Sequence, residues 1–382
     1  MNQKKVLLLT FWYPDEKQPV KGVFILEHAR AIKALGCDVY IFAVKINDGK
    51  RLLKRNHEYF IDSFGIPNYV VTIESALYKF IYANIPLLVA LVIRTFYRYI
   101  QPHFQPDIIH SNILSPCAIA GHFLSKKLKK PHIITEHWSK LDKFFRLNLF
   151  SRLGVLAYNR SASITVVSDW LRHKMIKYVD DPEKITIIPN VIDSVFSFKS
   201  RRKSDVINFV AVASWKPPKR IDLILESMNE FAGTTNKPVI FHIIGEGVLL
   251  DSGLTDKNLF SFEIVKHGFL PKPEVSEIMQ QSDYFIHCSE VETFSVVIAE
   301  ALCTGLPVLA SKVGAIPELI NDNNGLLCDN TSESWRDGIS RITSRQFDSR
   351  KISEDAIEKF SILKIGRQFL DVYNSAISGS PG

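Results

Sequence analysis

The chain has 382 residues, of which 46% are hydrophobic and 23% are charged, and its formal net charge is +7. This composition excludes a disordered chain, and the length exceeds what one hydrophobic core fills, so we expect a globular protein of two domains. The charge is uneven, because residues 1–200 carry 28 Lys and Arg against 16 Asp and Glu, whereas the remaining residues carry 19 against 24.

The five cysteines are widely scattered and lack the paired spacing of a zinc site. They are odd in number and three lie within apolar runs, so we interpret them as reduced core residues. The apolar run after the N-terminal lysines has four residues, which is too short for the core of a secretory signal. We therefore expect a cytoplasmic protein.

The basic bias of residues 1–200 indicates an anionic partner. Lys and Arg gather at residues 50–55, 94–98, 126–130 and 140–146. No signature of a nucleic-acid-binding fold accompanies them, so we do not expect nucleic acid as a partner. A phospholipid surface, a phosphate-bearing acceptor and a merely solvated basic face all remain open.

Strand and helix patterns alternate along the whole chain, which predicts an α/β protein with parallel sheets covered on both faces. In the first half, strands are expected over 5–10, 38–44, 107–110, 132–135, 162–167 and 184–189, with a helix over 23–35. In the second half, strands are expected over 206–213, 237–244, 260–267, 283–288 and 306–310. The polar and basic stretch 199–204 is the predicted linker.

One uncharged run of 14 residues, Phe80–Ile93, precedes Arg94 and Arg98, which lie among aromatic residues. It is too short for a membrane-spanning helix, which needs about 20 apolar residues. It is either a core helix or a segment that docks, with the nearby basic clusters, on an anionic membrane. The sequence leaves both open.

The stretch 283–311 predicts a strand, a helix over Phe294–Cys303 and a second strand. Parallel strands joined in this way place the helix N-terminus at the carboxyl edge of the sheet, where backbone N–H groups can bind a phosphate. Seven residues separate Glu292 from Glu300, the only charge on this helix. A buried lone carboxylate is costly unless it is hydrogen-bonded, and ribose hydroxyls would serve. The alternative is an ordinary unit with a surface Glu pair.

Glu292-x7-Glu300, with Thr293-Phe294-Ser295 and the following CTGLPVLAS, resembles the donor motif of the GT-B glycosyltransferases of the GT4 type, also called glycosyl transferases group 1. That motif usually has glycine where Thr293 and Ser295 stand here. Further motifs resemble the family in the expected order: Tyr13-Pro14 with Gly22, PDIIHSN at 106–112, Thr135–Trp138, TVVSDWL at 165–171, IIPNVIDSVF at 187–196, Lys219 in its donor loop, IIGEG at 243–247 and HGFL at 267–270.

The resemblance implies a GT-B fold, with two Rossmann-like doubly wound parallel-sheet domains facing across a cleft. Residues 1–198 would bind the acceptor and residues 199–360 the nucleotide-sugar donor, while 361–382 would form a helix returning to the N-terminal domain. The implied activity is retaining transfer of a sugar from a UDP- or GDP-linked donor to an acceptor hydroxyl. By analogy, the acceptor is a lipid-linked or saccharide precursor of bacterial capsule, O-antigen or exopolysaccharide.

The same resemblance assigns the donor site to residues of the second half. Lys219 and the helix N-terminus at Thr293, Phe294, Ser295 and Val296 would stabilise the departing phosphate. No DxD motif stands in a plausible site, so we expect neither a metal nor another cofactor.

Two carboxylates complete the implied donor site: Glu292 would contact hydroxyls of the transferred sugar, and Glu300 the ribose. One departure is that Ser214 stands where the family has an arginine, and Lys216 or Arg220 would have to replace its charge.

In the N-terminal half, His137 would face the cleft and bond the sugar or assist proton movement, unless it is an internally satisfied loop histidine. His110 and Gly22 are predicted to line the cleft or the acceptor site; a packed histidine and an ordinary turn glycine are the alternatives. Two other functions stay open, a UDP-sugar epimerase of the same fold and a non-enzymatic sugar- or lipid-binding protein.

Overall fold

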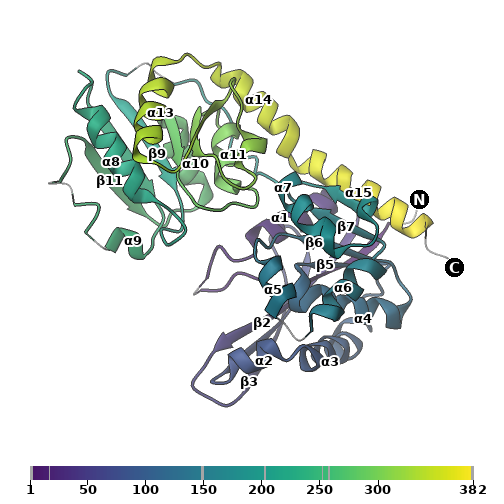
Figure 1. Cartoon of the computed structure of the whole chain (residues 1–382). Coiled ribbons are helices and arrows are strands. Elements are labelled where there is room, and N and C mark those ends of the chain that lie inside the picture. The colour runs from purple at the N-terminus through teal and green to yellow at the C-terminus, as the bar shows by residue number, and fades with distance from the viewer. Residues whose placement is uncertain are drawn as a thin grey trace. The chain divides into compact units, whose positions relative to one another are not determined.

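The computed structural model describes residues 3–16, 18–147, 150–201, 204–251, 253–256 and 259–379. The chain divides into two compact units, each built around one sheet (Figure 1). Unit 1 comprises Met1–Val191 and Ile362–Gly382, and unit 2 comprises Ile192–Ser361.

The sheet of unit 1 has eight strands in the order β3-β4-β2-β1-β5-β6-β7-β8. Their bounds are β1 Lys5–Thr10, β2 Asp38–Asp48, β3 Lys54–Ile61, β4 Pro67–Ser75, β5 Ile108–Asn112, β6 His132–Glu136, β7 Ser163–Val166 and β8 Ile185–Ile187. All neighbours run parallel except β3 and β4, which are antiparallel. The predicted parallel sheet is confirmed, and the antiparallel strand β3, which is almost wholly exposed, is an addition at its edge.

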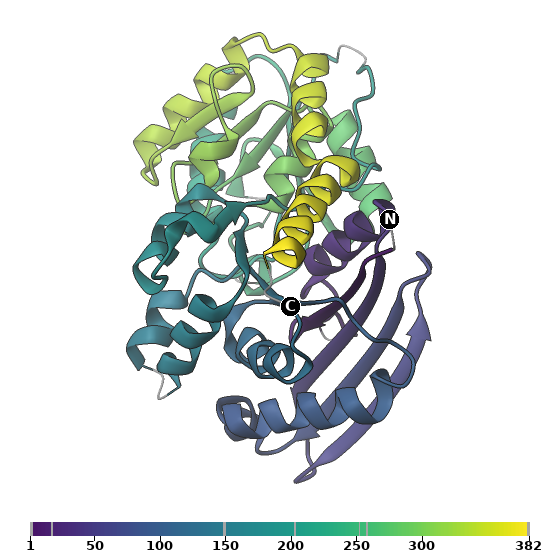
Figure 2. The same ribbon diagram turned by 90° about the vertical axis from the view of Figure 1, so that its right-hand side faces the viewer.

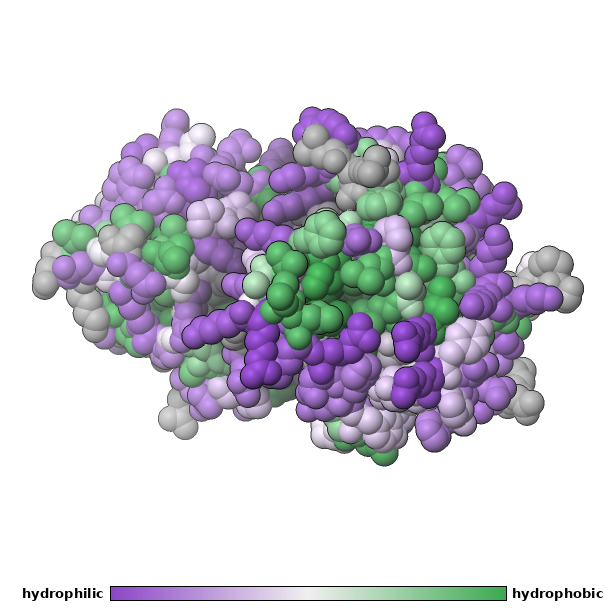
Figure 3. Space-filling view, turned by 90° about the horizontal axis from the view of Figure 1, so that it is seen from below, coloured by the Kyte–Doolittle hydropathy of each residue, from purple (hydrophilic) through white to green (hydrophobic). Residues whose placement is uncertain are grey.

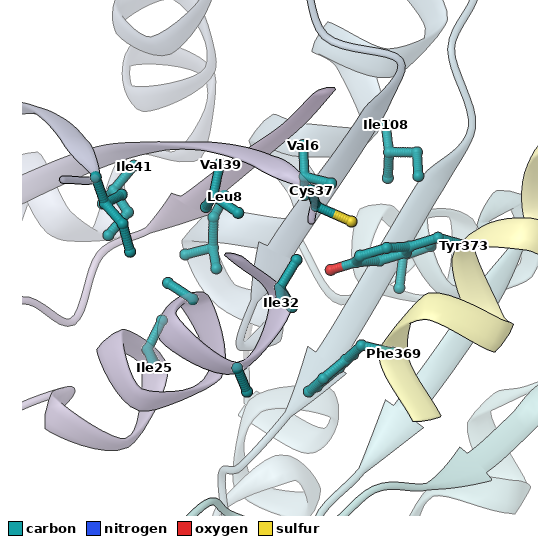
Figure 4. Close-up of a cluster of buried hydrophobic side chains, with 14 of the residues drawn as sticks. Val6, Leu8, Ile25, Ile32, Cys37, Val39, Ile41, Ile108, Phe369 and Tyr373 are labelled. Carbon is teal, nitrogen blue, oxygen red and sulfur yellow. The ribbon is translucent and has the colours of Figure 1, made fainter. Parts of the chain in front are cut away.

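Both faces of this sheet are covered, as predicted. Successive side chains of β1 point to opposite faces, so Val6 and Leu8 belong to one core and Leu7 and Leu9 to the other. Figure 4 shows the first core, to which α1 (Val23–Ala34) and α15 (Ile362–Ser378) contribute. The second core lies under α3 (Ile85–Thr95) and α4 (Ile119–Leu128).

The remaining helices of unit 1 are short: α2 Tyr78–Ala83, α5 Leu141–Leu147, α6 Ser151–Arg160 and α7 Asp169–Met175, with single turns η1 Phe96–Ile100, η2 Leu114–Ala118, η3 Ile176–Tyr178 and η4 Pro182–Lys184. The apolar run from residue 80 to 93 is divided between α2 and α3. Asn84 ends the first helix and caps the second, because its side chain accepts a hydrogen bond of 3.1 Å from the Leu87 amide. Among the described residues, no helix is both long and apolar enough to span a bilayer.

Unit 2 has six parallel strands in the order β11-β10-β9-β12-β13-β14. The strands are β9 Ile207–Val212, β10 Val239–Ile244, β11 Glu263–Gly268, β12 Tyr284–His287, β13 Val308–Ser311 and β14 Gly325–Cys328. The helices are α8 Ile221–Ala232, α9 Val248–Asp251, α10 Lys272–Gln281, α11 Val296–Cys303, α12 Ile316–Leu319, α13 Ser332–Ser344 and α14 Ser349–Phe360. Every strand predicted in this half is present, and β14 is an addition.

The boundary between the units lies before the predicted linker. The carbonyls of Val195 and Ser197 accept hydrogen bonds of 2.8 Å from the side chains of Ser276 and Gln280 on α10, which fastens this stretch to unit 2. The predicted boundary at 198/199 is displaced for that reason, and residues 202–203 of the predicted linker lie outside the described residues. Helix α15 belongs to unit 1 and lies beside α1 (Figure 2). Gly366 permits this, since a Cβ there would lie 2.3 Å from the Ala31 carbonyl oxygen.

Candidate functional site

Strand order in unit 2 brings two loops together at the carboxyl edge of the sheet. β9 is the first strand of the unit, and its neighbours are β10 on one side and β12 on the other. From β9 the chain continues to β10 on one side, and from β12 it continues to β13 on the other side. The point between the loops that follow β9 and β12 is therefore a topological switch point, which is where open α/β sheets bind ligands. Hydrogen bonds from the Arg220 amide to the Cys288 carbonyl (3.2 Å) and from the Glu290 amide to the Pro218 carbonyl (3.0 Å) fix the two loops side by side.

Three side chains meet where these loops touch, and we call them the Lys219 cluster: Lys219, His287 and Glu292. The Lys219 ammonium forms an ion pair with the Glu292 carboxylate. His287 Nε2 lies 3.1 Å from Lys219 Nζ and 3.0 Å from Glu292 Oε1. Two of these residues were predicted site residues, and His287 was not, because it reads as part of an apolar strand.

The electrostatics of the cluster favour an ionised carboxylate beside a neutral imidazole. Burial alone raises the pKa of Glu292, but the hydrogen bond with His287 and the charges nearby outweigh it and lower the pKa to about 2. Burial, and then the charge of Lys219, lower the pKa of His287, so its ring is neutral near pH 7. Depending on its tautomer, Nε2 either donates to Glu292 or accepts from Lys219.

The backbone of this site is held by close contacts that only glycine permits. A Cβ on Gly314 would lie 2.0 Å from the Glu292 carbonyl oxygen, which also accepts a hydrogen bond of 3.0 Å from the Ala315 amide. A Cβ on Gly247 would lie 2.2 Å from the carbonyl oxygen of Trp215 in the β9 loop. The loops that carry Lys219 and Glu292 are thus rigidly placed.

Helix α11 begins at Val296, two residues later than predicted. Its N-cap, Ser295, has φ of 74°, in the left-handed region that favours glycine. The Ser295 hydroxyl is buried and has no hydrogen-bond partner among the described residues. Phe294 packs edge-on against Phe360, so only its backbone can face a ligand. The first amides of α11 lie at the carboxyl edge of the sheet, as the phosphate site requires.

The other donor-site residues are placed as follows. Glu300 is buried on α11, and Thr293 is half-buried in the loop before the helix. Ser214 is exposed, as is Lys216. The guanidinium of Arg220 binds the Asp222 carboxylate at 2.6 Å and lies 3.7 Å from Glu290, so it is engaged away from the Lys219 cluster. The charge of the missing arginine is therefore not supplied by Arg220.

In unit 1, His137 follows the carboxyl end of β6 and is buried against Phe24, with 4.4 Å between the ring centroids. Neither ring nitrogen has a hydrogen-bond partner within the described part of the chain. Burial lowers the pKa of His137 well below its usual value, so the ring is neutral. A buried polar atom without a partner costs free energy, and a ligand hydroxyl would remove that cost.

Glu136 holds the loop that carries His137, a role the sequence did not reveal. This fully buried carboxylate accepts hydrogen bonds from the amides of His137 (2.8 Å), Trp138 (2.8 Å) and Leu114 (2.9 Å), and from the Tyr158 hydroxyl (2.9 Å). Burial raises its pKa in spite of these bonds. Four donors on one buried carboxylate give the loop a single conformation.

The contacts of His110 and Gly22 are internal. His110 is fully buried, with its ring nitrogens 2.7 Å from the Tyr373 hydroxyl and 2.6 Å from Thr135 Oγ1. These bonds match the packing alternative, and the cleft-lining role of His110 stays a prediction. Gly22 has φ of 74° and precedes α1, where a Cβ would lie 2.2 Å from the Trp12 carbonyl oxygen. That contact alone accounts for glycine, and its role toward an acceptor stays a prediction.

No group of three or more His, Cys, Asp and Glu side chains within the described ranges is arranged to hold a metal ion. All five cysteines are free and buried. Of the candidate site residues, those of the Lys219 cluster and the α11 terminus lie at the carboxyl edge of the unit 2 sheet, and His137 follows the carboxyl end of β6 in unit 1. Within unit 2, an ammonium group beside a helix N-terminus suits an anionic ligand.

Comparisons with known proteins agree with this geometry. The family model of glycosyl transferases group 1 matches residues 193–359, and that of glycosyltransferase family 4 matches residues 22–196. The GPI3 subunit of phosphatidylinositol N-acetylglucosaminyltransferase from Saccharomyces cerevisiae is 21% identical over 98% of this chain and 83% of its own length. TuaC, a putative teichuronic acid biosynthesis glycosyltransferase of Bacillus subtilis, is 21% identical over 93% of each chain.

Among solved structures, Anabaena HepE in complex with UDP superposes with a TM-score of 0.72 at 19% identity, covering 98% of this chain and all of the other. At such low identity the likeness shows the fold. The two family models, one for each half, show the family. The chain belongs to the GT4-type glycosyltransferases of group 1 and has their GT-B fold of two Rossmann-like units.

Proposed function

We propose that this glycosyltransferase takes a sugar from a uridine diphosphate donor and transfers it, with retention of configuration, to a lipid-linked or saccharide acceptor of bacterial cell-surface polysaccharide. The observation that carries the donor part is the pairing of Lys219 with Glu292 beside the N-terminus of α11. Anabaena HepE, which shares the fold, binds UDP and UDP-glucose in its solved complexes, and this supports uridine over guanosine.

The chemistry follows from where negative charge develops. The bond between the anomeric carbon and the diphosphate oxygen breaks, and the acceptor oxygen replaces it from the same face. The proton of the acceptor hydroxyl passes to the departing phosphate. Lys219 and the first amides of α11 would stabilise that phosphate, so that no metal ion is needed for this purpose. We therefore propose a metal-independent reaction, in which turnover survives EDTA.

Glu292 would change partners during this reaction. Once the diphosphate shares the Lys219 ammonium, the Glu292 carboxylate can accept hydrogen bonds from hydroxyls of the transferred sugar. In the pairing with Lys219 and His287, its pKa is lowered to about 2, which favours the ionised carboxylate. Glu300, one turn into the helix, would bind the ribose, and Ser295 and Thr293 would complete the phosphate contacts.

For unit 1 we propose that His137 binds a hydroxyl of the transferred sugar. Its two unpartnered ring nitrogens and its rigid loop support this role. A neutral imidazole can donate through one nitrogen and accept through the other, which suits a sugar hydroxyl better than a phosphate.

The proposed acceptor is supported by the names of the relatives and by the positive charge of the first half of the chain. GPI3 bears the name of a phosphatidylinositol N-acetylglucosaminyltransferase, and TuaC that of an enzyme of teichuronic acid biosynthesis. The first name contains a phospholipid and the second a polysaccharide, and these support a lipid-linked or saccharide acceptor for this chain. The basic first half of the chain suits such an acceptor at the cytoplasmic face of a membrane.

The donor can be tested with a thermal-shift panel of UDP-, GDP-, ADP- and CMP-sugars, followed by product analysis. We expect UDP-sugars to raise the unfolding temperature, and donor consumption to require an added acceptor. Anomeric configuration of the product is read by NMR coupling constants. Donor consumption without acceptor, giving an epimerised sugar, would replace transfer by epimerisation. Complete loss of turnover in EDTA, restored by Mg²⁺ or Mn²⁺, would remove the metal-independent mechanism.

A further inference from the structure

We infer that one face of unit 1 docks on an anionic lipid bilayer, and we call it the docking face: Leu52, Leu53, Leu77, Phe80 and Leu87. These side chains are unusually exposed for large apolar residues, from 47% for Leu87 to 76% for Leu52. Figure 3 shows hydrophobic residues gathered on this side of the molecule, with hydrophilic ones around them. The inference deepens the proposed function, because it assigns the membrane at which a lipid-linked acceptor would be met.

The docking face is continuous although its residues come from separate segments. The turn between β2 and β3 carries Leu52 and Leu53, and it is bonded to the entrance of α2. The Ala76 amide donates a hydrogen bond of 2.8 Å to the Arg51 carbonyl, and the Ser75 hydroxyl donates one to the Leu52 carbonyl. Leu77 and Phe80 follow directly, and Leu87 lies in the first turn of α3.

Core packing explains only one side of α3. Leu88, Leu91 and Val92 are buried against the sheet of unit 1. On the opposite side Pro86, Leu87 and Ala90 are exposed and equally apolar. A helix on the surface of a globular protein normally has a polar outer face. The segment thus has one side that packs in the core, as expected of a core helix, and one unpartnered apolar side, as expected of a docking segment.

Basic residues surround the docking face. Lys50 and Arg51 directly precede the leucines of the turn, Lys79 lies within α2, and Arg94 ends the apolar outer side of α3; all four are exposed. The Lys127 ammonium lies 5.3 Å from the centroid of the Tyr97 ring, which brings the lysines at 126–130 to the same border.

This arrangement matches the chemistry of an anionic bilayer. Apolar side chains enter the region between headgroups and acyl chains, while lysines and arginines bind the lipid phosphates. Long basic side chains can lay their methylenes along the apolar surface and keep their charge at the headgroups. Large apolar side chains that are exposed next to one another mark interaction surfaces more often than side chains that are exposed singly. Other exposed apolar residues, such as Val248 and Leu254 of unit 2, provide matched controls.

The test is flotation of the full-length chain with vesicles of phosphatidylcholine alone or of phosphatidylcholine mixed equally with phosphatidylglycerol. We expect binding to the mixed vesicles at low salt, at least about tenfold stronger than to neutral ones and reduced at high salt. Phe80→Ser/Leu87→Ser and Lys79→Ser/Arg94→Ser should each reduce that binding by about tenfold or more. Val248→Ser/Leu254→Ser, which changes equally exposed side chains of unit 2, should bind as the parent does.

Three results would overturn the inference: equal binding to neutral and mixed vesicles, no binding at low salt, or binding unchanged in Phe80→Ser/Leu87→Ser. A parent that is dimeric by analytical ultracentrifugation, binds no vesicles and becomes monomeric in that variant would assign the face to a second copy of the chain. UDP-induced thermal shifts of the same samples report folding and the donor site separately. A lack of UDP binding would count against the proposed function and leave the docking face to be judged by flotation.

Discussion

Lys219 and Glu292 are 73 residues apart in the sequence and form an ion pair at the carboxyl edge of the unit 2 sheet. Their meeting is a consequence of strand order, because β9 and β12 are neighbours while β10 and β11 lie on the other side of β9. The pair places a cation and an anion beside the helix terminus where a diphosphate and a sugar would lie. The predictions below test what each part of this arrangement contributes.

Removing either carboxylate should abolish most of the transfer activity. Glu292→Gln and Glu300→Ala each remove a charged hydrogen-bond acceptor, so we expect turnover to fall by roughly 10²–10³. Circular dichroism and the unfolding temperature should remain those of a folded protein. Glu290→Gln, which changes an exposed carboxylate nearby, is the control. Near-parental turnover in a Glu292 or Glu300 variant would show that this residue has another role.

His287 should position Glu292 rather than contact the substrate. His287→Leu removes the bond of 3.0 Å to the carboxylate and leaves the strand apolar, so we expect kcat to fall about tenfold with a small change in KM for the donor. Because neutral His287 acts through one hydrogen bond, His287→Gln should restore part of kcat. If His287→Leu and His287→Gln lose activity and stability alike, the residue is only a packing element.

Ser295 is held at φ of 74°, so replacing it with glycine should stabilise the protein. Ser295→Gly relieves a left-handed conformation and removes a buried hydroxyl that lacks a partner in the described chain, worth about 1 kcal/mol in total. The unfolding temperature should rise by about 2–4 °C. Gly314→Ala should do the reverse, since its Cβ would lie 2.0 Å from the Glu292 carbonyl oxygen. An unfolding temperature that falls in Ser295→Gly would mean that the hydroxyl stabilises the loop.

Acidification should destabilise unit 1 because several of its histidines are buried in the neutral form. Burial lowers the pKa of His28 to about 4 and of His110 and His132 to about 3, against an ordinary value of 6.5. Their folded-state pKa values are depressed, so below pH 6.5 the unfolded chain binds protons that the folded chain does not. The stability present above pH 6.5 is therefore lost as the pH falls, by up to about 1.4 kcal/mol per pH unit for each histidine.

This pH dependence can be measured as the unfolding temperature between pH 7.5 and pH 5. Glu136 works in the opposite direction, because burial raises its pKa, but it is outnumbered by the buried histidines His28, His110, His132 and His137. His110→Gln should give a shallower dependence than the parent, because it removes one of the buried histidines whose pKa is lowered. A flat profile over this range would contradict the buried, neutral state of the histidines.

The sequence predicted most of this fold because its strands are short apolar runs between turn signals. It did not predict β3, whose residues are nearly all exposed at the sheet edge, or its antiparallel partner β4, although most residues of β4 are buried. It did not predict the break at Asn84 either, since the cap depends on one side-chain hydrogen bond within an otherwise uniform run. Edge strands and helix breaks are decided by local contacts that hydrophobic periodicity does not register.

In the candidate site, too, sequence motifs indicated some residues, whereas others depend on contacts that only the structure shows. Lys219, Glu292 and Glu300 were found through family motifs, which mark loops and helix starts. His287 escaped because it lies within a strand, and its distance of 3.1 Å from Lys219 depends on which strands are neighbours. Arg220 was considered as a replacement for the missing arginine, and its bond with Asp222 could be seen only in the structure.

The central claim is that the Lys219 cluster and the α11 terminus bind a nucleoside diphosphate, and calorimetric titration with UDP and uridine tests it most directly. We predict that the parent binds UDP more tightly than uridine. Lys219→Ala should weaken UDP by about 10- to 100-fold while leaving uridine within about twofold, because only the diphosphate uses the ammonium. Lys351→Ala, which changes an exposed lysine on α14, should bind as the parent does. Equal affinity of the parent and Lys219→Ala for UDP, or no binding of any nucleoside diphosphate by the parent, would contradict the account.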